Sequence, residues 1–388
     1  MKFNPVLHGL RGMAALLVLL YHWIGNFPAL ANHHRSVSFL GTDWAPFFFI
    51  DYGWIGVHWF FVLSGYLLAA TIWNRPLTRH DVVQFWQRRF MRIYPALWVQ
   101  LAISIVATYA FLGSFQFLEA RQLVGNFLLW LAPLPGGVNM YNGVWWTLPV
   151  ELLFYLLLPL LLLCQRRWGL WPIVVMALLV SLGWRAGVAQ QHAGESLQRY
   201  AYLLKAFPGM LFLFVAGLSI NHWAGSAHLA VRRALLLPAV AIYVALLWLL
   251  DANKAVLEKG GPLLVTWDLL AGLSIALVIA ALIHPGKSVR WLGSTVLVRL
   301  GDWSYGIYLW HFPVLRWLPK LLPLPWNTIQ GSAGALGLCL VITLLLAFAS
   351  HEWVEKPALA WLARRQRAPR RTLSQTSQNP SLPPPQTP

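Results

Sequence analysis

The chain has 388 residues, of which 58% are hydrophobic and only 11% are charged, and its mean hydropathy is +0.59. Soluble domains are about 25% charged, so this composition excludes an ordinary soluble protein and indicates an integral membrane protein. Lys and Arg outnumber Asp and Glu by 29 to 12, a net charge of +17, but they are dispersed between apolar segments, which argues against a nucleic-acid partner.

Apolar runs long enough to cross a bilayer, about 20 residues, recur along the chain. These runs are continuous rather than alternating, and backbone groups in hydrocarbon must be satisfied internally, so they predict helices. The predicted fold is an all-α polytopic membrane protein with about ten transmembrane helices, at residues 6–27, 52–73, 90–113, 144–164, 170–187, 202–220, 233–250, 262–284, 303–322 and 332–353. The stretch 122–132 is too short to cross and is expected to be interfacial or re-entrant.

The basic residues predict the orientation of these helices. With the amino terminus inside, 19 of the 29 Lys and Arg residues are cytoplasmic, as the positive-inside rule requires. Both termini are therefore expected in the cytoplasm. Residues 1–362 form the expected transmembrane domain, and residues 363–388, rich in Arg, Pro, Ser and Gln, are expected to be a disordered cytoplasmic tail. The cytoplasmic residues are Lys2, Arg75, Arg79, Arg88, Arg89, Arg92, Arg166, Arg167, Arg232, Arg233, Lys287, Arg290, Arg299, Lys356, Arg364, Arg365, Arg367, Arg370 and Arg371.

The first span, in "GLRGMAALLVLLYH" (9–22), contains two ionisable residues, Arg11 and His22. Eleven residues at about 100° each come within about 20° of three full turns, so both lie on one helix face, about 16 Å apart along the axis. Ionisable groups within a span usually face an interior cavity, and a histidine there can transfer protons. A packed histidine with a snorkelling arginine is the structural alternative. A second alternative is that residues 1–31 are a secretory signal peptide that is cleaved after "ALA".

Other residues carry weaker signals. Three arginines, Arg88, Arg89 and Arg92, lie at the cytoplasmic end of the third span. Their guanidinium groups could bind phosphates, or they could serve only as a topology signal. Ser64 and Gly65 could allow close helix approach or contact a ligand. In "SYGIYLWHFP", Tyr305, Tyr308 and His311 are spaced by three and lie roughly on one face. The two cysteines, Cys164 and Cys339, have no metal-ligand or disulfide spacing, so no metal site is predicted.

Six segments together resemble one family. They are "LHGLRGMAALLVLLYH" (7–22), "GVHWFFVLSGYLL" (56–68), "RRFMRIYPALW" (88–98), "NGVWWTLPVELLFYLLLPLL" (142–161), "GDWSYGIYLWHFPVL" (301–315) and "HEWVEKPALAW" (351–361). In this order they resemble the motifs of the acyltransferase type 3 family of membrane O-acyltransferases. The resemblance implies transfer of an acyl group, commonly acetyl, from acyl-CoA to a hydroxyl of a carbohydrate or glycolipid. It also implies the bacterial inner membrane, acetyl-CoA as co-substrate and no permanently bound cofactor.

Acyl transfer to an alcohol needs a base for the hydroxyl proton and stabilisation of an oxyanion. The resemblance implies that His22 is this base and that Glu151, which matches the span-embedded glutamate of the family, orients its imidazole or stabilises its cation. An ion pair between Glu151 and an arginine is the structural alternative. The resemblance further implies that CoA phosphates are bound by Arg11, Arg88, Arg89 and Arg92, and that Tyr305 and His311 line the acceptor site. The chain departs from the family pattern at His58, where an acid is common, and at Leu152, where a polar residue is usual.

A secondary transporter or a flippase for a lipid-linked sugar is the alternative class. Such proteins also place His, Arg and Glu inside spans, near the membrane midplane. Many of them have two related halves with broken helices, and the chain shows no such repeat. The ordered motifs therefore favour the acyltransferase.

Overall fold

The structure is a computed structural model that describes residues 4–33, 37–39, 42–44, 48–112, 119–223, 234–253 and 261–367. Lys2, Arg232, Arg233 and the tail residues 368–388 lie outside these ranges. The helices are α1 (Pro5–Asn26), α2 (Ala29–His33), α3 (Phe48–Asp51), α4 (Gly56–Ile72), α5 (Arg79–Leu112), α6 (Ala120–Leu128), α7 (Thr147–Trp168), α8 (Leu170–Gln191), α9 (Leu197–Leu204), α10 (Phe207–Trp223), α12 (Leu236–Ala252), α14 (Pro262–Leu282), α15 (Thr295–Asp302), α16 (Ser304–Leu321), α17 (Ile329–Ser350) and α18 (Lys356–Arg367). The strands β1 (Val37–Phe39) and β2 (Thr42–Trp44) pair antiparallel, with Ser38 opposite Asp43.

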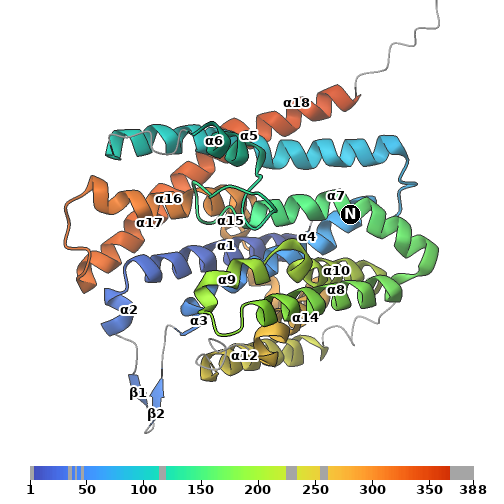
Figure 1. Cartoon of the computed structure of the whole chain (residues 1–388), viewed down its shortest axis with the longest axis horizontal. Coiled ribbons are helices and arrows are strands. Elements are labelled where there is room, and N and C mark those ends of the chain that lie inside the picture. The colour runs from blue at the N-terminus through green and yellow to red at the C-terminus, as the bar shows by residue number, and fades with distance from the viewer. Residues whose placement is uncertain are drawn as a thin grey trace, which may run out of the picture.

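The chain is a helical bundle, and each of the ten predicted spans overlaps a helix. Within the described ranges, seven helices are long and apolar enough to cross a membrane, or eight if the bent pair α9–α10 is one span. The count of ten therefore remains a prediction. Helix α12 has only 17 residues, and α16 has 18 and contains two prolines together with Arg316 and Lys320. Most of the long helices lie roughly parallel in Figure 1.

Two helices extend beyond the predicted boundaries. Helix α5 starts at Arg79, well before the predicted start at residue 90. Thr78 and Asp81 form a reciprocal cap there: the Asp81 backbone N–H donates to the Thr78 hydroxyl oxygen, and Asp81 accepts from the Thr78 backbone N–H. Helix α18 follows α17 through a π-helical turn and continues to Arg367, past the predicted start of the tail at 363. Basic side chains in its last turn interact favourably with the negative end of the helix dipole and so stabilise this part of the helix.

Helix α1 lies in the middle of the bundle, between α4, α15 and α16 (Figure 1). Leu7, Ala15 and Leu19 are completely buried. The Trp23 indole donates to the Ser332 carbonyl of α17. This central packing favours retention of α1 over its removal as a signal peptide.

Glycines let α4 and α10 pack closely. A Cβ on Gly65 would lie 2.0 Å from the Phe214 carbonyl oxygen, and one on Gly217 would lie 2.0 Å from the Val62 carbonyl oxygen. A real side chain at either position would force the helices apart. Gly65 therefore serves the close helix approach that its sequence context suggested.

Three prolines free backbone carbonyls that side chains then satisfy. A proline has no N–H, so the carbonyl four residues earlier loses its helical donor. The freed Leu309 carbonyl before Pro313 accepts from Gln100 and Asn142, the Tyr155 carbonyl before Pro159 accepts from Trp86, and the Leu204 carbonyl before Pro208 accepts from Arg185. Backbone groups in a membrane interior need such partners. These contacts therefore hold α16, α7 and the α9–α10 break in place.

Candidate active site

Arg11 and His22 lie on helix α1 at two different positions along the long axis of the bundle. Arg11 lines a cavity of about 60 Å³ between α1, α4, α7 and α16. His22, three turns further along, contacts the rings of His311 and Phe312 on α16, with centroid distances of 5.1 and 5.2 Å. Both side chains therefore point toward α16, in agreement with the shared helix face inferred from their spacing.

The hydrogen bonds of His22 and His311 assign their tautomers. His311 Nδ1 lies 2.9 Å from the Ile307 carbonyl, and His22 Nδ1 lies 2.9 Å from the Val18 carbonyl. A carbonyl only accepts, so each Nδ1 carries the proton. The Nε2 of neutral His311, 3.1 Å from His22 Nδ1, then accepts from the same Nδ1–H, which it shares with the Val18 carbonyl. This arrangement leaves the lone pair of His22 Nε2 available to accept a proton.

His311 is held firmly in this position. It is completely buried, and it lies two residues before Pro313, whose freed Leu309 carbonyl accepts from Gln100 at 2.6 Å and from Asn142 at 3.0 Å. These two buried amides come from α5 and from the segment that precedes α7. They fix the part of α16 that carries His311, so the imidazole pair has a defined geometry.

Glu151 lies in the cavity beside Arg11. One of its carboxylate oxygens accepts from the Ser64 hydroxyl at 3.0 Å and from the Tyr155 hydroxyl. Its charge acts directly on Arg11. The predicted contact with the imidazole is not made, because Glu151 lies in the cavity at the level of Arg11, about 16 Å along the α1 axis from His22. The ring that orients His22 belongs to His311 instead.

The three arginines of α5 have different partners. Arg88 donates to the Gln366 side chain of α18 at 3.0 Å. Arg92 donates to Glu355 at 2.5 Å, and that carboxylate is only 1% exposed. Arg89 lies over the Phe85 ring, and its buried Nε has no hydrogen-bond partner among the described residues. Arg89 is therefore the member of the three whose buried N–H lacks a partner among the described residues.

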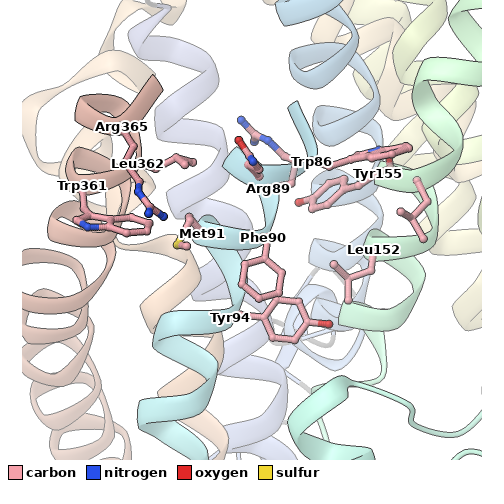
Figure 2. Close-up of a pocket in the computed structure, with 12 residues that line it drawn as sticks. Trp86, Arg89, Phe90, Met91, Tyr94, Leu152, Tyr155, Trp361, Leu362 and Arg365 are labelled. Atoms are coloured by element: carbon pink, nitrogen blue, oxygen red, sulfur yellow. The ribbon is translucent and has the colours of Figure 1, made fainter. Parts of the chain in front are cut away.

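Arg89 lines a cleft of about 510 Å³ between α5, α7 and α18 (Figure 2). The walls are mostly apolar and aromatic. Figure 2 shows Trp361 and Arg365 of α18 on one side of the cleft and Trp86 and Tyr155 on the other. Tyr155 lines this cleft. It also donates a hydrogen bond to Glu151, which lines the cavity of about 60 Å³ beside Arg11 (the inner cavity). Tyr155 therefore connects the lining of the cleft with a residue that lines the cavity.

The tyrosines of α16 line the inner cavity. The Tyr305 hydroxyl donates to the Ile93 carbonyl at 2.8 Å, and the Arg92 guanidinium lies 5.7 Å from its ring centroid. The Tyr308 hydroxyl donates to the Val144 carbonyl at 2.5 Å, and its ring lies 5.9 Å from that of His311. The hydroxyl of Tyr305 is thus engaged by the protein backbone, while its ring faces the cavity.

Comparison with known proteins supplies the family. The family model described as "Acyltransferase domain" matches residues 4–352. The chain belongs to the acyltransferase type 3 family. Peptidoglycan O-acetyltransferase OatA of Listeria monocytogenes is 25% identical over 92% of this chain and 56% of its own length. Acyltransferase MdmB of Streptomyces mycarofaciens is 30% identical over 93% of each protein.

The coverage of these relatives differs. O-acetyltransferase OatA of Staphylococcus aureus is 22% identical over 92% of this chain and 57% of its own length. The chain thus spans about half the length of the two OatA proteins but nearly all of MdmB. No solved structure matches the chain. Membership of this family supports an acyltransferase over the transporter alternative.

The sequence analysis did not predict a second cluster of buried polar residues. Asp268 of α14 accepts from His58 Nε2 at 2.5 Å and pairs with Arg185 of α8. All three side chains are buried. His58, where the family often has an acid, thus contacts an acid from another helix. Arg185 and Asp268 both fall inside predicted spans, and ionisable residues there were the signal that could have identified them.

Proposed function

We propose that the protein is a membrane-embedded O-acetyltransferase that moves an acetyl group from acetyl-CoA to a hydroxyl of a carbohydrate or glycolipid. The family and the names of its relatives, two of them O-acetyltransferases, support the reaction type. The observation that carries the proposal is the series of polar side chains between the α5–α18 cleft and His22. It runs from Arg89 through Tyr155, Glu151 and Tyr308 to the His311–His22 pair.

The cleft of Figure 2 suits the donor. Arg89 has an unpartnered donor, and Arg365 lies across the same cleft. Guanidinium groups bind phosphates through two parallel hydrogen bonds, and aromatic rings such as Trp361 can stack on an adenine base. Among the arginines first predicted to bind CoA, this geometry favours Arg89. Arg88 and Arg92 contribute positive charge, and each already holds one contact, with Gln366 of α18 and with Glu355 respectively.

His22 is the proposed general base. Its Nε2 accepts the proton of the acceptor hydroxyl while the oxygen attacks the thioester carbonyl carbon. The tetrahedral intermediate then collapses, the carbon–sulfur bond breaks, and the imidazolium returns its proton to the CoA thiolate. His311 accepts from Nδ1–H throughout and holds the ring in the required tautomer, as a third group orients the base in serine hydrolases.

The inner cavity would have to widen for this reaction. At about 60 Å³ it holds only a few water molecules, which is too little space for the pantetheine arm. Tyr155 and Ser64 both reach Glu151 across it. Movement of Tyr155 would join the cleft to the cavity, and Arg11 would then meet the arm on its way to His22.

The proposal is tested by mass spectrometry of cell-envelope glycans from a strain that lacks the gene. Loss of O-acetyl groups is expected, with recovery on expression of the wild-type chain and no recovery with His22→Ala. Unchanged acetylation in the deletion strain and in all complemented strains would refute the proposed acceptor class. Peptidoglycan, on which the OatA relative of Listeria monocytogenes is named to act, is the first glycan to examine.

A further inference from the structure

Lys205 stands out among the charged residues that the proposed reaction does not use. It occupies the break between α9 and α10, which meet at 47°. Its ammonium lies 4.5 Å from the ring centroid of Trp54 and 5.6 Å from that of Trp146. Among the described residues it has no ion-pair or hydrogen-bond partner. Two tryptophan faces therefore hold a cation that has donors available.

The nearest acid does not neutralise Lys205. Asp268 already pairs with Arg185 through one oxygen and accepts from His58 through the other. Asp268, Arg185 and Lys205 together carry one excess positive charge. Lys205 falls inside the predicted span 202–220, and a charged residue there indicates a functional site. The missing counter-charge is most simply an anionic ligand.

Side-chain hydrogen bonds hold the backbone at the break between α9 and α10, where Lys205 lies. Pro208 removes the helical donor of the Leu204 carbonyl, and Arg185 replaces it at 3.2 Å. The Trp184 indole donates to the neighbouring Leu203 carbonyl at 2.8 Å. Arg185 thus joins Asp268 to the backbone directly before Lys205, and the position of the ammonium is set by buried contacts.

Lys205 lies at the end of the bundle that holds His22. It is the charged side chain that acts on His22 through space. Trp54 follows Gly53, whose backbone packs against Leu17 and Tyr21 of α1. Trp146 directly precedes Thr147, which hydrogen-bonds Tyr308 beside His311. The two rings that hold the ammonium therefore belong to segments that also contact the helices of the imidazole pair.

We infer that Lys205 binds an anionic group, a carboxylate or a phosphate, on the sugar acceptor while Trp54 and Trp146 contact the sugar. This inference rests on the proposed function and narrows its acceptor to an acidic carbohydrate. The ammonium supplies the charge-assisted hydrogen bond, and the aromatic rings supply apolar faces. An acceptor anchored in this way would present a neighbouring hydroxyl to His22.

Ligand-detected NMR titration of the full-length protein in detergent tests the inference. The ligands are neutral N-acetylglucosamine, carboxylate-bearing N-acetylmuramic acid and N-acetylglucosamine 1-phosphate. The wild type should bind at least one acidic sugar roughly tenfold to a hundredfold more tightly than the neutral one, as expected for a charge-assisted hydrogen bond. The acidic sugar that is preferred identifies the anion.

The variants separate Lys205 from general surface charge. Lys205→Met should abolish the preference, Lys205→Arg should keep most of it, and Arg199→Met, which removes an exposed charge from α9, should leave it unchanged. Equal binding of all three sugars by the wild type, or a preference that survives in Lys205→Met, would overturn the inference. Binding is measured without acetyl-CoA, so a failure of acetyl transfer would count against the proposed function alone.

Discussion

The Nε2 atom of His311 lies 3.1 Å from the Nδ1 atom of His22, although the two residues are 289 positions apart in the chain. Because both Nδ1 protons are directed at carbonyls of their own helices, His311 acts as the acceptor in this contact. Residues from the first and the ninth predicted spans thus form the proposed general base together.

His22→Ala is expected to reduce acetyl transfer by about 10²–10⁴-fold, the usual contribution of a positioned general base. Release of the CoA thiol from purified protein measures this effect. The side chain is only half-buried, so the variant should insert and purify normally, which size-exclusion chromatography checks. Near-normal turnover would remove His22 from the mechanism.

Two substitutions of His311 separate its hydrogen bond from its volume. The carbonyl oxygen of Gln in His311→Gln can still accept from His22 Nδ1–H, whereas His311→Phe fills the space without an acceptor. Loss of one neutral hydrogen bond predicts a decrease in kcat of up to about tenfold for Phe, and a smaller one for Gln. The positioning role would be contradicted if both variants lost activity equally while KM and thermal stability stayed at wild-type values.

The neighbouring arginines Arg88 and Arg89 form a matched pair for the donor site. Arg89→Ala should raise the KM for acetyl-CoA by about tenfold to a hundredfold, because it removes a charge-assisted contact to phosphate. Arg89→Lys should recover only part, since an ammonium lacks the bidentate geometry. Arg88→Ala, which loses its contact with Gln366, should change KM little. A larger effect at Arg88 than at Arg89 would place the donor elsewhere.

Arg92 is expected to act on stability. Arg92→Ala leaves the carboxylate of Glu355 buried without its partner, and such a loss destabilises proteins by roughly 3–5 kcal/mol. The double variant Arg92→Leu with Glu355→Leu removes both charges and should melt closer to the wild type. Thermal unfolding in detergent compares the three proteins. If Arg92→Ala melted like the wild type but had a raised KM for acetyl-CoA, direct phosphate binding would be the better explanation.

The sequence predicts the helices well because an apolar run in a membrane has few structural options. Boundaries are less predictable. The polar residues from Arg79 onward are helical because the Thr78–Asp81 cap starts α5 early. The span 202–220 is broken because Pro208 frees the Leu204 carbonyl. Both causes are visible in the sequence, but their effect depends on neighbouring side chains.

The sequence names candidate site residues but does not predict their contacts. His22, Glu151 and Arg89 were identified from motifs, and the structure places each beside a cavity or an α16 side chain. The pairing of Glu151 with Ser64 and Tyr155, and of His22 with His311, depends on how distant helices meet. Helical spacing on one segment carries no information about the depth at which another segment crosses it.

The last prediction concerns sidedness, on which the cytoplasmic donor path depends. If the positive-inside distribution is correct, the exposed residues Arg79, Arg167 and Arg290 face the cytoplasm, while exposed Glu195, between α8 and α9, faces outward. Single cysteines at these positions, in a background of Cys164→Ala and Cys339→Ala, should separate into two groups. A membrane-impermeant thiol reagent should label only position 195 in intact cells, and only positions 79, 167 and 290 in inverted vesicles. The α5–α18 cleft would then open toward cytoplasmic acetyl-CoA, and the His22 end would lie nearer the outer surface, about 16 Å beyond Arg11. Labelling of position 79 from outside would reverse this orientation and rule out a cytoplasmic donor entering beside Arg89.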